Sequence, residues 1–181
     1  MPVRKASAYR HWKRPFTRTS RVRSKGYIKT IPPISIVKSV MGNSRKFFEN
    51  KYPFVAKIIC NEEVQIRDIA LESARRQLHR EIELNIGMDY YMAISIYPHH
   101  ILRENKMLTG AGADRMSQGM SHSYGSNVGR AAQVKKGQPI FTVGLPSEDA
   151  LKKFREYYHF TKQKLPCKTH VEVEKIDVKE E

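Results

Sequence analysis

The residues best suited to chemistry lie in one glycine-rich stretch, residues 99–127. Within it, the run from Gly110 to Arg115 (Gly-Ala-Gly-Ala-Asp-Arg) has the composition of a phosphate-binding loop. It fails the dinucleotide-binding fingerprint because an arginine replaces the third glycine and no helical pattern follows. It also lacks the Gly-Lys-Ser or Gly-Lys-Thr of a P-loop. The stretch therefore does not predict a nucleotide site.

Histidines in the same stretch are the candidate metal ligands: His99, His100 and His122. Adjacent residues at a strand end point to opposite faces, which suits a shared metal poorly. Two serines flank His122, but no nucleophile elbow or orienting carboxylate accompanies them. The acids of the stretch, Glu104 and Asp114, lie too far apart on irregular chain to indicate an acid–base pair. We therefore expect no catalytic residue, no bound metal and no cofactor.

Alternating segments must hold this stretch at both ends. Residues 88–97 alternate and lead into it through Pro98, and residues 128–135 lead out of it. A structureless segment of this length inside a compact domain is uncommon, and it is usually functional or disordered. We expect residues 98–127 to form a long functional loop, with a solvated loop as the alternative that composition alone leaves open.

Six runs rich in apolar and β-branched residues predict strands. They are residues 34–40, 54–60, 88–97, 128–134, 139–144 and 169–176. The fourth and fifth runs flank the turn signal Lys136-Gly137, so they are expected to pair as a hairpin.

Two runs with helical periodicity lie between these strands. The first has an apolar face formed by Ile66, Ala70, Ala74, Leu78 and Ile82, with Ile69 beside it. The second begins after Ser147, a good N-cap, and has an apolar face formed by Ala150, Leu151, Phe154, Tyr157 and Tyr158. Two main helices packed on a mainly antiparallel sheet give an α+β fold, a two-layer α/β sandwich.

The composition points to a polyanionic partner. The chain of 181 residues has 33 Lys and Arg against 18 Asp and Glu, a formal charge of +15. Nucleic acid is the first candidate and an anionic membrane surface the second. No apolar run approaches membrane-spanning length, and the N-terminus has no apolar signal region. Cys60 and Cys167 lack metal-ligand spacing, so we expect two buried thiols in a reducing compartment.

The positive charge is concentrated at the N-terminus, where residues 1–48 contain thirteen Lys or Arg and no Asp or Glu. An acid-free segment with interleaved aromatic rings suits a phosphate backbone with exposed bases. A free solvated tail and a transit peptide are the alternatives. The residues expected to contact RNA are Arg4, Lys5, Arg10, Trp12, Lys13, Arg14, Phe16, Arg18, Arg21, Arg23 and Lys25. In the first helix, Arg75, Arg76 and Arg80 are placed with His79 off the apolar face, as a solvated face or as RNA contacts.

Several motifs resemble one ribosomal protein family, numbered ten-e in archaea and eukaryotes and sixteen in bacteria. The strongest are Tyr97-Pro-His-His-Ile-Leu-Arg-Glu-Asn-Lys-Met-Leu, Gly110-Ala-Gly-Ala-Asp-Arg-Met and Gln118-Gly-Met. Similar motifs occur at Tyr9-Arg10, at Ala70-Leu-Glu-Ser-Ala-Arg and over residues 125–140. The likeness is closest to archaeal members. The segment 34–40 lacks the aromatic-acidic strand ending of eukaryotic members, and their C-terminal extension is absent.

The resemblance implies a hammerhead-like sheet and a structural, non-enzymatic protein of the large ribosomal subunit in the cytoplasm. Its partners would be large-subunit rRNA, tRNA and neighbouring ribosomal proteins, without a membrane or a small-molecule substrate. The loop would face tRNA near the peptidyl transferase centre through Arg103, Lys106, Met107, Gly110, Gly112, Asp114, Arg115, Gln118, Gly119 and Met120. An RNA-modifying enzyme or assembly factor is the alternative, and a nucleotide-dependent enzyme is a third.

The expected organisation has three parts. Residues 1–30 are a basic RNA-binding extension, and residues 31–176 are a single α+β domain that carries the loop 98–127. Residues 177–181 are an acidic, frayed C-terminus.

Overall fold

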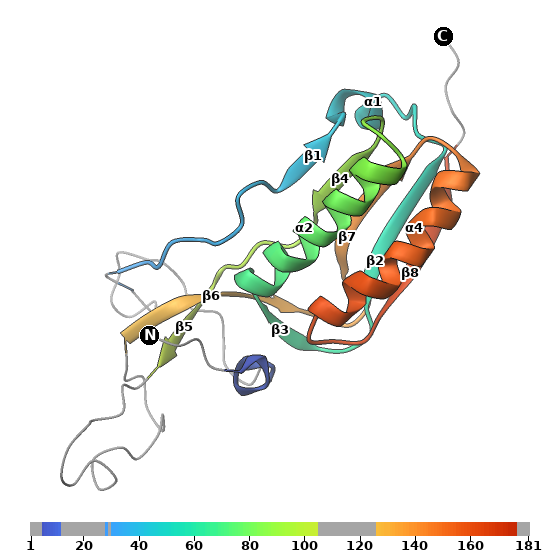
Figure 1. Cartoon of the computed structure of the whole chain (residues 1–181). Helices are drawn as coiled ribbons and strands as arrows, with labels where there is room; N and C mark the ends of the chain where they lie inside the picture. Colours follow the sequence, from blue (N-terminus) through green and yellow to red (C-terminus); the bar gives the residue numbers. More distant parts are fainter. Residues whose placement is uncertain (1–4, 12–27, 29, 105–125, 177–181) are drawn as a thin grey trace, which may run out of the picture.

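The structure, a computed structural model, describes residues 5–11, 28, 30–104 and 126–176. Two long helices, α2 (Asp68–Asn85) and α4 (Glu148–Thr161), lie side by side against a sheet (Figure 1). The shorter helical elements are η1 (Ala6–Tyr9), α1 (Ser44–Phe48) and η3 (Lys162–Lys164). Every strand pairing in this part of the chain is antiparallel. The predicted α+β class with two main helices is confirmed.

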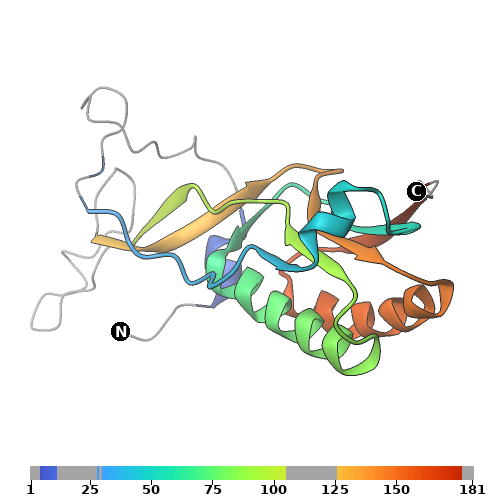
Figure 2. The same ribbon diagram turned by 90° about the horizontal axis from the view of Figure 1, so that it is seen from above.

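The larger sheet has five strands in the order β1-β4-β7-β2-β8. Their bounds are β1 Val40–Gly42, β4 Tyr91–Ile94, β7 Pro139–Leu145, β2 Phe54–Cys60 and β8 Thr169–Lys175. Seen from above, α2 and α4 cover the same face of this sheet (Figure 2). Residues from that face, such as Ile58, Met92 and Phe141, are fully buried and form the core with the helices.

Strand β6 (Ser126–Val134) belongs to a second, three-stranded sheet with β3 (Val64–Arg67) and β5 (His100–Glu104). The hairpin predicted between residues 128–134 and 139–144 is therefore wrong, because β7 joins the larger sheet instead. The turn itself is present. Gly137 has φ +81°, which favours glycine, and its N–H donates to the carbonyl of Cys60 at 2.8 Å. The turn signal predicted the reversal but not the strand partners, which lie far away in the sequence.

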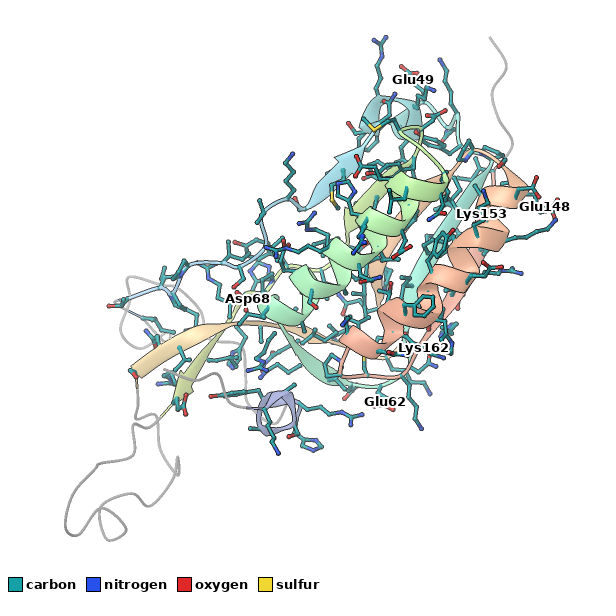
Figure 3. All side chains as sticks on the ribbon, in the orientation of Figure 1. Glu49, Glu62, Asp68, Glu148, Lys153 and Lys162 are labelled. Atoms are coloured by element: carbon teal, nitrogen blue, oxygen red, sulfur yellow. The ribbon has the colours of Figure 1, made fainter. Side chains whose placement is uncertain are left out.

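The first predicted strand, residues 34–40, is wrong: only Val40 lies in a strand. The preceding backbone bonds to carboxylates of α2. The N–H of Ser35 donates to Asp68 at 2.9 Å, and that of Val37 donates to Glu72 at 3.4 Å. Residues 30–39 therefore form an irregular segment, here called the strap, that Figure 1 shows running past the start of α2 towards β1. Figure 3 shows Asp68 at that start.

The other predicted strands match the structure to different degrees. Residues 54–60 coincide with β2, and residues 169–176 match β8 to within one residue. The run 88–97 is a strand only over β4, Tyr91–Ile94. The predicted loop 98–127 is shortened at both ends, because β5 and the start of β6 extend into it. Residues 105–125 lie outside the described residues.

Helix α2 buries most of the predicted face, since Ala74, Leu78 and Ile82 were all expected there, and Leu71 is added to it. Leu71, Ala74, Leu78 and Ile82 are fully buried, whereas Ile69 is 47% exposed. The predicted Ile66 lies before the helix, in β3. Helix α4 follows the prediction more closely. The hydroxyl of Ser147 accepts from the N–H of Ala150 at 3.2 Å, which caps the helix, and the buried face includes Ala150, Leu151 and Phe154.

Candidate nucleic-acid interface

The start of the basic N-terminal segment is attached to the smaller sheet. The N–H of Gln65 in β3 donates to the carbonyl of Arg10 at 3.0 Å, and its side chain donates to the carbonyl of Tyr9 at 2.9 Å. The guanidinium of Arg10 forms an ion pair with Glu62 at 2.6 Å, and Lys5 is exposed. Figure 3 shows Glu62 at the end of the body near η1.

These contacts attach residues 5–11 to β3 and its neighbour Glu62. The other expected RNA contacts of the segment lie outside the described residues: Arg4, Trp12, Lys13, Arg14, Phe16, Arg18, Arg21, Arg23 and Lys25.

Of the three arginines of α2 that were expected to contact RNA, two lie on the exposed face of the helix. Arg80 is exposed, and the side chain of Arg76 is 69% exposed although it donates to Glu72 at 2.9 Å. The assignment of Arg75 to this face is wrong, because its side chain is only 9% exposed. Helical spacing explains the error: Arg75 follows Leu71 by four residues and precedes Leu78 by three, so all three share the buried face.

Arg75 is tolerated in the core because Glu72 neutralises it. The guanidinium donates twice to the carboxylate, at 2.6 and 2.7 Å, and once to the sulfur of Met41 at 2.9 Å. The hydrogen bond from Arg75 holds the pKa of Glu72 below its ordinary value despite burial, and the same bond raises the pKa of Arg75. Glu72 also accepts from the strap at Val37, so this pair connects the strap to the core.

The base of the loop 98–127 is a pair of antiparallel strands. Arg103 lies in β5 opposite Asn127 in β6, next to a register shift between Leu102 and Arg103. Arg103 is partly exposed at the point where the chain leaves β5. The other residues expected to face tRNA lie outside the described residues: Lys106, Met107, Gly110, Gly112, Asp114, Arg115, Gln118, Gly119 and Met120.

Sequence reasoning missed a group of residues that attach the strap to β6. The guanidinium of Arg130 donates to the carbonyl of Pro32 at 2.8 Å and to the hydroxyl of Tyr97 at 3.2 Å. The amide of Asn127 donates to the carbonyl of Thr30. The strap, β6 and the segment around Tyr97, which follows β4, therefore meet beside the loop base. No sequence signal identifies these contacts, because the two with the strap join residues 97 and 98 positions apart and the one with Tyr97 joins residues 33 positions apart.

A second exposed basic group follows α4, and its lysines were also missed. Lys162, Lys164 and Lys168 are all exposed, within and just after η3. Figure 3 shows Lys162 at the same end of the body as Glu62, which is the end where the N-terminal segment is attached. Lysines at η3 and arginines on α2 together give the helical layer several cations that can contact phosphates.

The residues considered for chemistry do not form a catalytic or metal site in the described part of the chain. His99 is exposed and His100 is 8% exposed, so they point to different surroundings as predicted. No group of three or more His, Cys, Asp or Glu suited to a metal occurs among the described residues. Cys60 and Cys167 are free and buried, as predicted. None of the helices in the described ranges has the length and apolar character to span a bilayer.

Comparison with known proteins agrees with the motifs. The family described as ribosomal protein L16p/L10e matches residues 13–172. A large ribosomal subunit protein uL16 from Pyrobaculum arsenaticum is 40% identical over 176 residues, which cover 96% of this chain and 93% of that protein. The uL16 protein of Methanospirillum hungatei is 39% identical over 83% of this chain and 86% of its own length. That of Thermofilum pendens is 36% identical over 96% and 98%.

The family match begins after the attached residues 5–11 and includes both long helices and both sheets, with β8 covered as far as residue 172. The matches support the structural ribosomal protein among the readings that the residues left open. The chain belongs to the ribosomal protein L16p/L10e family and is a structural component of the ribosome rather than an enzyme.

Proposed function

We propose that this chain is a constituent of the large ribosomal subunit that binds rRNA and supports the placement of tRNA. The observation that carries the proposal is the match to uL16 proteins over nearly the whole chain, at 40% identity over 176 residues in the case of Pyrobaculum arsenaticum. As a ribosomal protein, the chain works in the cytoplasm, among rRNA and neighbouring ribosomal proteins.

The charge distribution supports rRNA as the main partner. A formal charge of +15 favours a polyanion through the release of condensed counterions. The exposed cations of the body lie on different elements, Arg76 and Arg80 on α2 and Lys162, Lys164 and Lys168 after α4. We propose that these residues contact phosphates and position the body, while residues 1–30 form an RNA-binding extension of the single domain 31–176. Residues 177–181 form a short acidic C-terminus.

The tRNA role is proposed for the loop between β5 and β6. Both strands of the loop base are part of the smaller sheet, which gives residues 105–125 a fixed starting point. The loop sequence contains Lys106 and Arg115, four glycines and three methionines, a composition suited to close, adaptable contact with nucleic acid. Peptide transfer itself belongs to RNA, so we assign the loop a positioning role and no chemistry.

Reconstitution tests the subunit role. Large subunits assembled without this chain are incubated with the purified protein and sedimented at rising KCl concentrations. We expect one copy per subunit that resists moderate salt, because many phosphate contacts must break together. A substoichiometric protein that washes off at low salt would refute a structural role and indicate a visiting factor.

Loop replacement tests the tRNA role separately. Residues 106–120 are replaced by a short Gly-Ser linker, with an equal-length Gly-Ser replacement as the control for loop length. Stability should change little, because the entropy of loop closure varies slowly with length. We expect normal incorporation into subunits but slower peptidyl transfer and weaker tRNA retention for both variants. Normal kinetics at full incorporation would contradict the tRNA role and leave the rRNA role intact.

A further inference from the structure

Two aromatic rings are held together on the surface between β4 and β5. The N–H of His99 donates to the carbonyl of Tyr97 at 3.0 Å, which closes a three-residue turn around Pro98. Pro98 is buried and has a fixed φ, so it anchors the turn. The turn brings the rings of Tyr97 and His99 into contact, with centroids 4.6 Å apart and planes inclined by 54°.

The Tyr97 ring is fixed at its hydroxyl end as well. The guanidinium of Arg130 donates to this hydroxyl at 3.2 Å and simultaneously holds the carbonyl of Pro32 at 2.8 Å. The turn and β6 therefore constrain the ring directly, and the strap holds Arg130 in place. Despite these contacts Tyr97 remains 52% exposed, and His99 is exposed too. About half of the Tyr97 side chain is exposed to water although its position is fixed, so the ring contributes little to the hydrophobic core.

We propose that Tyr97 and His99 form a stacking site for an unpaired base of rRNA, with Arg130 as the adjacent cation. The inference rests on the proposed rRNA role and adds a specific contact to it. Unpaired RNA bases stack on aromatic rings and on guanidinium planes, and a ring that is already fixed loses little entropy on binding. We call these residues the Tyr97 stacking site.

The surroundings favour an RNA base over an apolar protein segment. Tyr97 contacts the polar side chains of His99 and Arg130, and Arg130 brings a positive charge to the hydroxyl end of the ring. The site includes the start of the predicted loop 98–127, and Arg130 pairs with Ile101 on β5, two residues before the partly exposed Arg103. A protein segment would require the desolvation of these polar groups, whereas a nucleotide offers a flat ring for stacking and a phosphate for the cations.

The test compares single substitutions in the full chain. Affinity for large-subunit rRNA of the source organism is measured by filter binding at several KCl concentrations. Tyr97→Ala removes the ring, Tyr97→Phe keeps the ring but loses the hydroxyl, and Phe160→Ala removes a matched surface ring. Phe160 is 54% exposed on α4 and contacts the neighbouring His159, so it controls for the loss of an exposed aromatic side chain. Thermal melts confirm that each variant is folded.

We expect Tyr97→Ala to weaken binding about tenfold with an unchanged slope of log K against log salt, because stacking releases no counterions. Tyr97→Phe should retain most of the affinity, and Phe160→Ala should bind like the wild-type protein. Irradiation of the wild-type complex at 254 nm should attach a nucleotide to Tyr97 or His99, identified by mass spectrometry, even if Tyr97→Ala does not fold.

Wild-type affinity in a folded Tyr97→Ala variant, or an absence of crosslinks at both rings, would overturn the stacking site while rRNA binding itself stands. A loss shared with Phe160→Ala would overturn its assignment to this pair of rings. Intact RNA affinity combined with failed incorporation into subunits would assign the rings to a protein contact instead. A wild-type chain that binds no rRNA would overturn both the stacking site and the proposed function.

Discussion

The substitution Arg75→Met tests whether Arg75 lies on the buried face of α2, where it forms an ion pair with Glu72. Methionine retains much of the volume of arginine but removes the two hydrogen bonds to Glu72, whose side chain is 6% exposed. Removal of one partner of a buried ion pair typically costs about 3–5 kcal/mol. Arg76 still reaches Glu72 at 2.9 Å, so we expect the low end, about 3 kcal/mol. For a chain of 181 residues this corresponds to a fall in Tm of roughly 6–12 °C.

The pH dependence gives an independent signature of the same pair. Arg75 lowers the pKa of Glu72 in the folded chain below the ordinary value of 4.5. A lowered folded-state pKa stabilises the fold above the unfolded pKa, and this stabilisation is lost as the pH falls through the folded value. The stability difference between wild-type protein and Arg75→Met should therefore be full at neutral pH and shrink below about pH 4.5.

Urea unfolding followed by circular dichroism measures this difference across the pH range. Arg80→Met is the matched control, because Arg80 is exposed on the same helix and its loss should change stability by less than about 0.5 kcal/mol. If Arg75→Met unfolded like the wild-type protein but lost rRNA affinity, Arg75 would lie on the exposed face and our account of the buried pair would be wrong.

Two further predictions follow from the fold. Arg76→Glu with Arg80→Glu should weaken rRNA binding and reduce its salt dependence while Tm stays near the wild-type value; a fall in Tm without a change in binding would show that these arginines are structural. Gly42→Ala should destabilise strongly, because Gly42 has φ +78° and an added Cβ would lie 2.0 Å from the carbonyl oxygen of Tyr90. The matched control is Gly129→Ala, where nothing lies within 4 Å of the added atom; equal melting of the two variants would contradict this reasoning.

Local sequence signals predicted the elements that depend on local interactions. Strand β2, helix α4 and the cap at Ser147 follow from patterns within a few residues of each other. Strand β3 was missed because it has only four residues and its Ile66 was assigned to the following helix, and β5 was missed because its five residues lie within the predicted loop. The hairpin was mispredicted because β6 finds its partners in segments far from the turn.

In the candidate site, too, local signals were predicted from the sequence and contacts between distant segments were not. Net charge and motifs predicted the partner class and the family, and exposure on α2 agrees with the prediction for Arg76 and Arg80. Arg75 was misplaced because a buried arginine cannot be recognised without its carboxylate partner. The contacts of Arg130 with the strap and with Tyr97 depend on how distant segments meet, so only the fold reveals them.

Salt dependence of rRNA binding is the most direct test of the central claim that charge in the N-terminal segment binds rRNA. Six cations are replaced by glutamine in the full chain: Lys13, Arg14, Arg18, Arg21, Arg23 and Lys25. The attachment of residues 5–11 to β3 is left intact, and Lys/Arg exchange at the same six positions preserves the charge as the control. We predict that the slope of log K against log salt becomes shallower by up to about 4 in the glutamine variant and is unchanged in the exchange variant. Equal slopes for wild-type protein and the glutamine variant would contradict the claim.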